Sequence, residues 1–163
     1  MDTLKRDDFC SFCGTRHTMT AYPKQCGICH QVTYRNAVAV GVGLVPVNQG
    51  LLVIRRGIPP HVGELALPGG FKEVDETWEE GIAREVFEET GVRVDPAGIT
   101  LAGVKTAHNG TVLVFGLCAP VVLPADPYPF VPDPETREVL VLDRFEELCF
   151  PHHTAMARWF WSR

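Results

Sequence analysis

Acidic side chains are concentrated in residues 70–92 (GFKEVDETWEEGIAREVFEETGV), which carry six glutamates and one arginine between positions 76 and 90. In a helix, at about 100° per residue, Glu85, Glu88 and Glu89 occupy one arc about 100° wide, largely opposite the apolar residues. Carboxylates at these spacings repel one another by roughly a few tenths of a kcal/mol per pair, and a hard cation removes that repulsion. The segment therefore predicts a metal-binding helix face, with a solvated acidic face as the alternative.

The chemistry expected of such a face is hydrolysis at phosphorus. Clustered carboxylate oxygens suit Mg²⁺ or Mn²⁺, and Mg²⁺ is usually held by one or two carboxylates together with waters and substrate phosphates. A metal that contacts two phosphate oxygens neutralises charge in the transition state, orients the leaving group and lowers the pKa of a bound water. A phosphate-containing substrate is therefore expected.

The same segment resembles the Nudix hydrolase signature G-x5-E-x7-R-E-U-x-E-E-x-G-U, in which U is aliphatic. The residues that fill its specified positions are Gly70, Glu76, Arg84, Glu85, Val86, Glu88, Glu89, Gly91 and Val92. The resemblance extends over roughly residues 36–163. It implies an α+β or α/β fold, an α/β/α sandwich with a mixed sheet, and a metal-dependent hydrolase that cleaves the diphosphate linkage of a nucleoside diphosphate joined to another group.

The resemblance also assigns roles to the residues of this segment. Glu85 and Glu89 would be the principal ligands of Mg²⁺ or Mn²⁺, and Glu88 an additional ligand. Arg84 would orient the carboxylates, and Glu76 would support the loop or a second metal. These four glutamates and Arg84 are the expected metal-binding and catalytic residues.

Candidate substrate-binding residues lie outside the acidic helix. Arg55 and Arg56 are candidate phosphate ligands, because arginine binds phosphate through two parallel hydrogen bonds. Ordinary surface charges at a strand end are the alternative. Gly70 would be a backbone position in the turn that precedes the helix. Tyr128 and Phe130 belong to a proline-rich loop, and their rings either stack a base or pack.

The general base is expected in the loop around Glu135 and Glu138, just before a strand, where some relatives place a glutamate that acts as base or ligand. Glu138 is the residue favoured here, although the helix carboxylates alone are an alternative. His152 and His153 are expected to be exposed or capping residues rather than catalytic ones. Trp78 is another aromatic that either stacks a base or packs.

A second metal site is predicted near the N-terminus from two CxxC pairs separated by twelve residues. Each pair can bend its backbone around one ion so that four sulfurs surround Zn²⁺ tetrahedrally. Residues 1–34 have no apolar run that could build a core, so zinc would hold them together. The expected zinc ligands are Cys10, Cys13, Cys26 and Cys29. Four thiolates leave no open position, so this zinc would be structural.

A zinc ribbon before such a domain resembles the architecture of NADH pyrophosphatases. Those enzymes carry a Ser-Gln-Pro-Trp type motif after the signature, whereas this chain has LAGVKTAHNG at residues 101–110. ADP-ribose or nucleotide-sugar substrates are therefore favoured. The alternatives are an NADH pyrophosphatase and a catalytically silent nucleotide sensor or zinc-ribbon binding module.

The elements that would position these residues follow from turn and capping signals. Asn48-Gln49-Gly50 indicates a hairpin, and Thr77 with Glu80 fits a capping box that starts a helix ending before Gly91. The expected strands are residues 36–47, 51–55, 101–107, 111–119 and 139–142. The expected helices are residues 77–90, 144–148 and 153–161. A zinc ribbon in residues 1–34 and a hydrolase domain in residues 35–163 are the expected domains.

The composition of the chain limits the remaining classes of function and location. The chain has 163 residues and a formal net charge of −5, which argues against general nucleic-acid or membrane binding. No apolar run approaches the roughly 18 residues of a membrane span. Thiols that bind metal stay reduced in the cytoplasm, which is the expected location. A small-molecule nucleotide is the expected partner, and a homodimer is compatible with the sequence.

Overall fold

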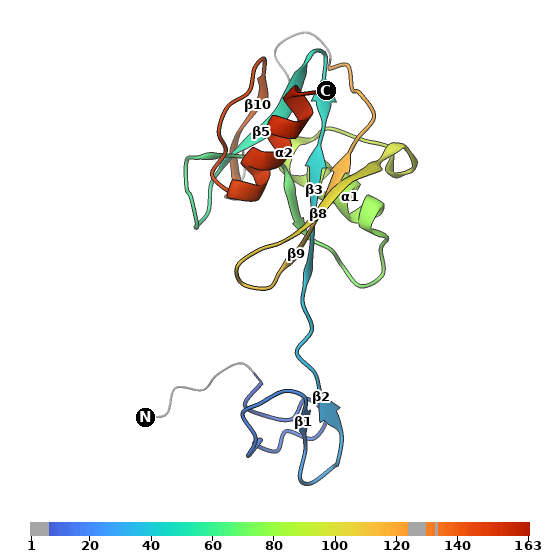
Figure 1. Ribbon diagram of the computed structural model, residues 1–163, viewed down its shortest axis with the longest axis vertical. Helices are drawn as coiled ribbons and strands as arrows, with labels where there is room; N and C mark the ends of the chain where they lie inside the picture. Colours follow the sequence, from blue (N-terminus) through green and yellow to red (C-terminus); the bar gives the residue numbers. More distant parts are fainter. Residues whose placement is uncertain (1–6, 124–129, 133) are drawn as a thin grey trace. The chain divides into compact units, whose positions relative to one another are not determined.

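The computed structural model describes residues 7–123, 130–132 and 134–163 (Figure 1). The chain divides into two compact units, Met1–Ala37 and Val38–Arg163. Within the described residues, no helix has the length and apolar character needed to cross a membrane.

The N-terminal unit is built around two short antiparallel strands, β1 (Lys24–Gln25) and β2 (Val32–Thr33). The second cysteine pair lies in the turn between them, where the His30 amide donates to the Cys26 carbonyl over 3.1 Å. An equivalent bond of 2.9 Å, from the Gly14 amide to the Cys10 carbonyl, closes the turn around the first pair. Gly14 has a φ of 74°, a conformation that glycine adopts without steric cost. Both cysteine pairs therefore sit on tight turns.

The C-terminal unit contains two sheets. A mixed sheet has the order β7-β3-β9-β8, in which β3 and β9 are parallel and the other neighbours antiparallel. An antiparallel sheet has the order β10-β5-β4, with β6 also paired to β5. The strands are β3 (Ala39–Leu44), β4 (Pro46–Val47), β5 (Gly50–Arg56), β6 (Leu65–Ala66), β7 (Gly69–Phe71), β8 (Thr100–Thr106), β9 (Val112–Leu117) and β10 (Thr136–Leu142).

Two helices pack against opposite faces of β3. Side chains alternate across a strand, so Gly41 and Gly43 share one face and Val42 and Leu44 share the other. The glycine face meets Ile82 and Val86 of α1 (Trp78–Thr90). The valine face belongs to the core cluster that contains Met156 and Ala157 of α2 (Pro151–Trp161). This arrangement confirms the expected α/β/α sandwich with a mixed sheet.

Helix α1 begins and ends at the predicted signals. The Glu80 amide donates to the Thr77 hydroxyl over 3.2 Å, and the Thr77 amide donates to the Glu80 carboxylate over 2.7 Å. Gly91 follows the last helical residue with a φ of 72°, and its amide donates to the Phe87 carbonyl. The capping box and the left-handed C-terminal glycine therefore fix the length of the helix that carries the acidic face.

Several predicted boundaries are wrong. Residues 144–148 form no helix, because the Leu148 backbone bonds to the Thr154 hydroxyl and the next amide bonds to the Leu65 carbonyl. Helix α2 begins at Pro151, two residues before the predicted start. The predicted strand 36–47 is interrupted at Val45, which separates β3 from β4. Strand β10 begins three residues earlier than predicted, where it pairs with the end of β5.

Candidate active site

The carboxylates of α1 line a cleft in the C-terminal unit. The cleft has a volume of about 360 Å³ and is lined by Glu85, Glu88, Glu89, Pro134 and Glu135. Three of these residues come from the last two turns of α1, and two come from the segment that leads into β10. The structure therefore brings a fourth carboxylate, from a distant part of the chain, into the same cleft as the three on the helix.

Arg84 organises the acidic residues around this cleft. Its guanidinium donates two hydrogen bonds to the Glu76 carboxylate, of 3.0 and 2.8 Å. It also donates to Glu85 over 2.8 Å, to Glu88 over 3.1 Å and to the Phe71 carbonyl over 2.9 Å. These bonds lower the pKa of Glu76 to about 2 and raise the pKa of Arg84 itself. Glu76 is thus an ionised partner that fixes Arg84, and it is not among the residues described as lining the cleft.

Glu89 and Glu85 are fixed against the glycines of β7. The Gly69 amide donates to the Glu89 carboxylate over 2.7 Å, and the Glu89 residue is only 9% exposed. The Glu85 carboxylate lies so close to Gly70 that a methyl group on that glycine would overlap it. A β-carbon at Gly69 would overlap the Gly41 carbonyl oxygen. Gly69 is therefore required by the backbone that it approaches, whereas a side chain at Gly70 would displace the Glu85 carboxylate.

Burial changes the ionisation of the two innermost carboxylates. Desolvation raises the pKa of Glu89 to about 8, with the Gly69 amide opposing the shift. Desolvation also raises the pKa of Glu85, with Arg84 opposing the shift. A divalent cation favours the ionised form of both carboxyl groups, because its charge compensates for the solvation by water that burial removes. The donor set, all carboxylate oxygen, fits Mg²⁺ or Mn²⁺ held by Glu85, Glu88 and Glu89.

The loop carboxylate in the cleft is Glu135, whereas the sequence favoured Glu138. Glu138 lies on β10 opposite Arg55, and their side chains form an ion pair of 2.7 Å, half exposed on the glutamate side. Glu135 precedes the strand and is held by the Gly57 amide, which donates to the Glu135 carbonyl over 2.6 Å. The register of β10 against β5 therefore places Glu138 against Arg55 rather than in the cleft.

Arg55 and Arg56, the two candidate phosphate ligands, form hydrogen bonds within the chain. Arg55 donates to Glu138 and, over 3.0 Å, to the Gly63 carbonyl. Arg56 donates to the Pro60 carbonyl over 2.9 Å, and its guanidinium lies 5.2 Å from the centre of the Phe150 ring. Both side chains therefore stabilise the loop between β5 and β6.

The remaining candidates do not line the described cleft. Tyr128 lies outside the described residues, and Phe130 is partly buried. Trp78 packs against a core cluster behind α1. His153 is buried rather than exposed, and its Nδ1 accepts the Leu67 amide over 3.2 Å. The role of His153 is structural. A histidine near the start of a helix gives no signal in the sequence that would predict this role.

The four N-terminal cysteines meet as their spacing predicts. Their sulfurs lie within 4.8 Å of one another, with Cys10 to Cys29 and Cys13 to Cys26 both at 3.6 Å. Tetrahedral Zn²⁺ with bonds of about 2.3 Å requires sulfurs about 3.8 Å apart, so the cluster is compatible with zinc. The other two cysteines, Cys118 and Cys149, lie elsewhere, and burial raises the pKa of their thiols to about 12 and about 11.

Comparison with known proteins identifies similar chains. A family model described as the NUDIX domain matches residues 35–160. The NAD-capped RNA hydrolase NudC of Haemophilus influenzae is 36% identical over 97 residues, which are 56% of this chain and 36% of that protein. The ADP-ribose pyrophosphatase of Methanocaldococcus jannaschii is 48% identical over 56 residues, which are 34% of this chain and 32% of that protein.

A solved structure matches over more of the chain. The crystal structure of a NUDIX hydrolase from Nitrosomonas europaea superposes with a TM-score of 0.79 at 26% identity, covering 94% of this chain and 90% of the other. The matched segments make up between 32% and 50% of the lengths of the curated relatives. The similarity to those relatives is therefore a similarity of one part of each protein.

Proposed function

This chain belongs to the Nudix hydrolase family, and we propose that it cleaves the diphosphate linkage of a nucleoside diphosphate joined to another group. ADP-ribose-like compounds and nucleotide sugars are the favoured substrates. The observation that carries the proposal is the cleft in which Arg84 holds the carboxylates of α1 facing Glu135. On an acidic helix face that was merely solvated, Glu89 would be exposed and burial would not raise its pKa.

Each residue of the cleft has a distinct task in this reaction. Glu85, Glu88 and Glu89 would hold Mg²⁺ or Mn²⁺, which when bound neutralises phosphate charge and lowers the pKa of a water. Arg84 keeps two of these carboxylates in place, and Glu76 fixes Arg84. The Gly69 amide holds Glu89.

Glu135 is the proposed general base, in place of Glu138. It faces the helix carboxylates across the cleft, where an attacking water would lie. As that water adds to one phosphorus, its proton passes to a Glu135 oxygen, and the bond from that phosphorus to the bridging oxygen breaks. The products are two phosphate monoesters, or a monoester and inorganic phosphate, according to the substrate.

The second candidate function is hydrolysis of NADH or of an NAD-like end group. Its support is the similarity to a protein named NAD-capped RNA hydrolase over 97 residues. Against it stands the stretch 101–110, LAGVKTAHNG, which lacks the expected Ser-Gln-Pro-Trp type motif. A catalytically silent sensor is disfavoured because Arg84 and the carboxylates that it orients are all in place.

The test is a substrate panel with Mg²⁺ or Mn²⁺ that contains ADP-ribose, nucleotide sugars, NADH and a nucleoside triphosphate. We expect kcat/KM for ADP-ribose or another diphosphate-linked nucleoside to exceed that for NADH. A preference for NADH would support the second candidate, and no turnover of any diphosphate would contradict both. Exchange of Phe130 for Ala or Tyr128 for Ala is expected to change KM more than kcat.

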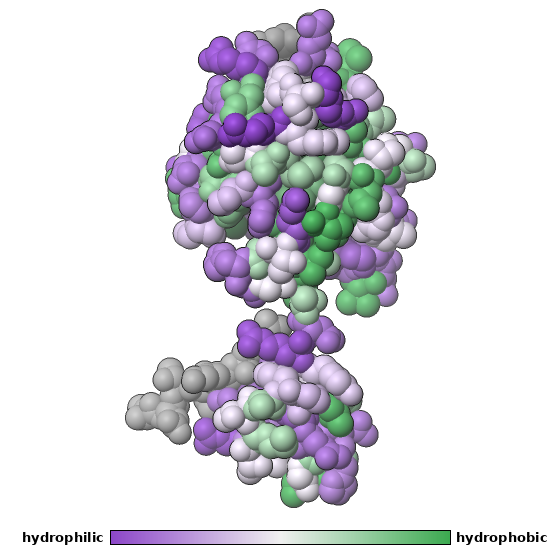
Figure 2. Space-filling model, in the orientation of Figure 1, coloured by the Kyte–Doolittle hydropathy of each residue, from purple (hydrophilic) through white to green (hydrophobic). Residues whose placement is uncertain are grey.

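Three further properties belong to the same proposal. We propose Zn²⁺ as the ion of the cysteine cluster, with a structural role in a zinc ribbon of residues 1–34. We propose a cytoplasmic location, because the cysteines are free thiols. We also propose a homodimer, supported by β8, which has no second strand neighbour among the described residues and on which Leu101 and Val104 are more than half exposed. Figure 2 shows a cluster of hydrophobic residues on the visible face of the C-terminal unit.

A further inference from the structure

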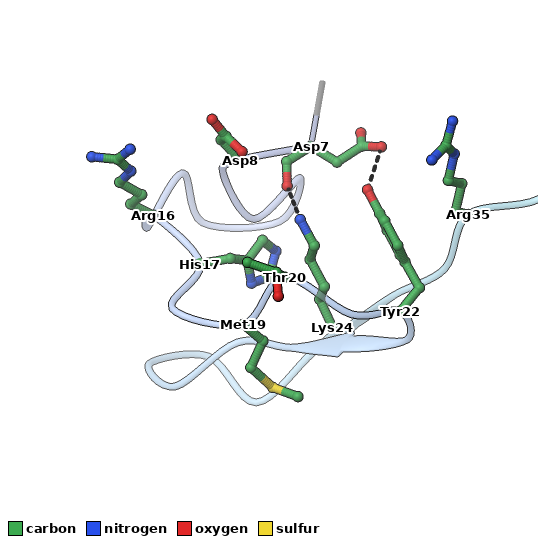
Figure 3. Close-up of a pocket in the computed structure, with 9 residues that line it drawn as sticks. All are labelled: Asp7, Asp8, Arg16, His17, Met19, Thr20, Tyr22, Lys24 and Arg35. Carbon is green, nitrogen blue, oxygen red and sulfur yellow. Dashed lines mark hydrogen bonds between the residues drawn. The ribbon is translucent and has the colours of Figure 1, made fainter. Parts of the chain in front are cut away.

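A second pocket lies within the N-terminal unit, which the proposed reaction does not use. It has a volume of about 470 Å³, larger than the carboxylate cleft (Figure 3). Pockets of this size accommodate small organic molecules rather than a lone ion. Its walls include the side chains of Lys24, His17 and Tyr22. The question is which ligand these groups could recognise.

Lys24 is a buried cation without a carboxylate partner among the described residues. The residue is only 5% exposed, and its ammonium donates one hydrogen bond, of 2.9 Å, to the Asp7 backbone carbonyl. The same ammonium lies 4.7 Å from the centre of the Tyr22 ring. A buried ammonium has three donors and is costly to desolvate unless a negative charge compensates it. An anion in the pocket would supply that charge.

A second polar group in the pocket wall also lacks a partner. The Nε2 atom of His17 is buried and has no hydrogen-bond partner among the described residues. Most buried side-chain nitrogens have at least one partner, so a bound molecule or a rearrangement on binding would account for this atom. His17, Thr20 and Lys24 all line the pocket (Figure 3).

The charges around the pocket favour an anion. Two further cations, Arg16 and Arg35, lie at its two sides (Figure 3). The carboxylates that line it are Asp7 and Asp8, and that of Asp7 accepts the Tyr22 hydroxyl over 2.8 Å. Among the described lining residues, three side chains are cationic and two are carboxylates, and the Asp7 carboxylate already accepts the neutral Tyr22 hydroxyl. The C-terminal unit, by contrast, carries the excess of acidic residues of the chain.

We propose that this pocket binds the phosphate group of a nucleotide, with the Lys24 ammonium as its principal ligand. Ammonium and guanidinium groups form short, charge-assisted hydrogen bonds to phosphate oxygens. Arg16 and Arg35 line the same pocket, at its two sides in Figure 3, and add positive charge to its walls. The volume beyond the phosphate leaves room for a sugar or base. The site lies in a different unit from the hydrolytic cleft and does not depend on the reaction proposed for it.

The test is a titration of the full-length, zinc-containing protein with AMP and with inorganic phosphate, followed by amide NMR without added Mg²⁺. We expect AMP to shift the amide signals of residues 16–22, 24 and 35. Equal affinity for phosphate would mean that the phosphate alone is recognised. Tighter binding of AMP would mean that the nucleoside contributes. Either result supports the site.

Two variants test the assigned ligands. Lys24→Gln should weaken AMP binding at this pocket at least about tenfold, and Arg35→Gln should weaken it severalfold. Arg144→Gln, which removes a 75% exposed guanidinium from the other unit, should leave the affinity unchanged. Because Lys24 is buried, zinc content and signal dispersion must first match those of the wild type. If Lys24→Gln does not fold, Arg35→Gln alone decides.

Three outcomes would overturn the proposal. The first is the absence of shifts in the N-terminal unit at AMP and phosphate concentrations up to about 10 mM. The second is a set of shifts confined to Val38–Arg163, since only the hydrolytic cleft would then bind the ligand. The third is an affinity that is the same for the wild type and Arg35→Gln in folded protein.

Discussion

At the scale of single residues, Arg84 is the centre of the acidic cluster, because it bonds to Glu76, Glu85 and Glu88 at once. The signature specifies these residue types, so the sequence could predict which side chains meet. It could not choose between Glu135 and a glutamate three residues later. That choice depends on the register of β10 against β5, which pairs Glu138 with Arg55. Register follows from long-range packing and is not encoded in the spacing alone.

The partners of Arg55 and Arg56 were beyond prediction for a related reason. Sequence shows two arginines at a strand end, which is equally typical of phosphate ligands and of surface charges. The loop that follows, residues 57–64, turns its carbonyls back toward both guanidiniums. The backbone of a loop is set by its own turns, and no side-chain pattern in the sequence reports where its carbonyls point.

His153 provides a pH-dependent prediction at this scale. Burial lowers its pKa to about 3 from an ordinary value of 6.5. Between these two values the unfolded chain binds a proton that the folded chain does not, so stability should fall as the pH decreases through this window. The contribution approaches about 1.4 kcal/mol per pH unit in the middle of the window.

The variant His153→Asn keeps an acceptor for the Leu67 amide but does not titrate. We expect it to be less stable than the wild type near neutral pH by about 1 to 3 kcal/mol, and to lose less stability on acidification. Urea unfolding at about pH 7 and about pH 5 measures both quantities. His152→Asn, which removes the neighbouring ring, is the matched control, and its pH dependence should stay closer to that of the wild type than to that of His153→Asn. Parallel curves for wild type and His153→Asn would show that the buried ring contributes nothing to it.

At the scale of elements, helix α1 was the most predictable part of the fold. Its start and end are fixed locally, by the pair Thr77 and Glu80 and by Gly91. Residues 144–148 were wrongly predicted as a helix, because the Leu148 backbone bonds to Thr154 of α2 and the amide of the next residue, Cys149, bonds to Leu65 of β6. Capping motifs therefore predict helix boundaries here better than residue propensity does. A capping motif specifies which groups form the hydrogen bonds, whereas a propensity does not.

Gly57, which follows β5, contacts the segment that carries Glu135 into the cleft. Its amide holds the Glu135 carbonyl, and a methyl group on it would overlap the Pro134 carbonyl oxygen. Gly57→Ala should therefore displace the segment that carries Glu135 and lower kcat about tenfold or more, with a smaller change in KM. Steady-state kinetics on the preferred substrate measures this.

A matched control is Gly103→Ala in β8. The nearest atoms that its methyl would meet belong to Met156 at 3.7 Å, an ordinary contact distance. This variant should keep wild-type kinetics. If Gly57→Ala folds and also keeps the wild-type kcat, the position of Glu135 does not matter for the reaction, and its role as the base is contradicted.

At the scale of the whole molecule, the chain combines two units with different sources of stability. The C-terminal unit has two core clusters on the two faces of β3. Among the described residues of the N-terminal unit, the buried apolar ones are two of the four clustered cysteines, Cys10 and Cys26. The cysteine spacing predicted this cluster because metal ligands are read from local sequence. The pocket in the same unit was not predicted, since the residues that line it lie between positions 7 and 35 without forming any motif.

The role of the cysteine cluster leads to a prediction on metal content. Protein prepared under reducing conditions and dialysed to remove loosely bound ions should retain about one zinc per chain, because structural zinc contributes on the order of 10 kcal/mol to folding. Elemental analysis measures this. Cys26→Ser should lose the zinc, whereas Cys149→Ser should keep it. Less than half an equivalent of zinc in the wild type would contradict the zinc ribbon.

The central claim is that the carboxylates of α1 hold the metal that drives hydrolysis. Its most direct test is the turnover of the preferred substrate with Mg²⁺ by Glu85→Gln and Glu89→Gln, with Glu79→Gln, a glutamate of the first helical turn, as the matched control. Glutamine keeps the size of each side chain but removes the charge that a cation requires. We predict that kcat falls about 100-fold or more in both variants, that both remain folded, and that the control keeps wild-type turnover. Near wild-type turnover by either folded variant would contradict the claim.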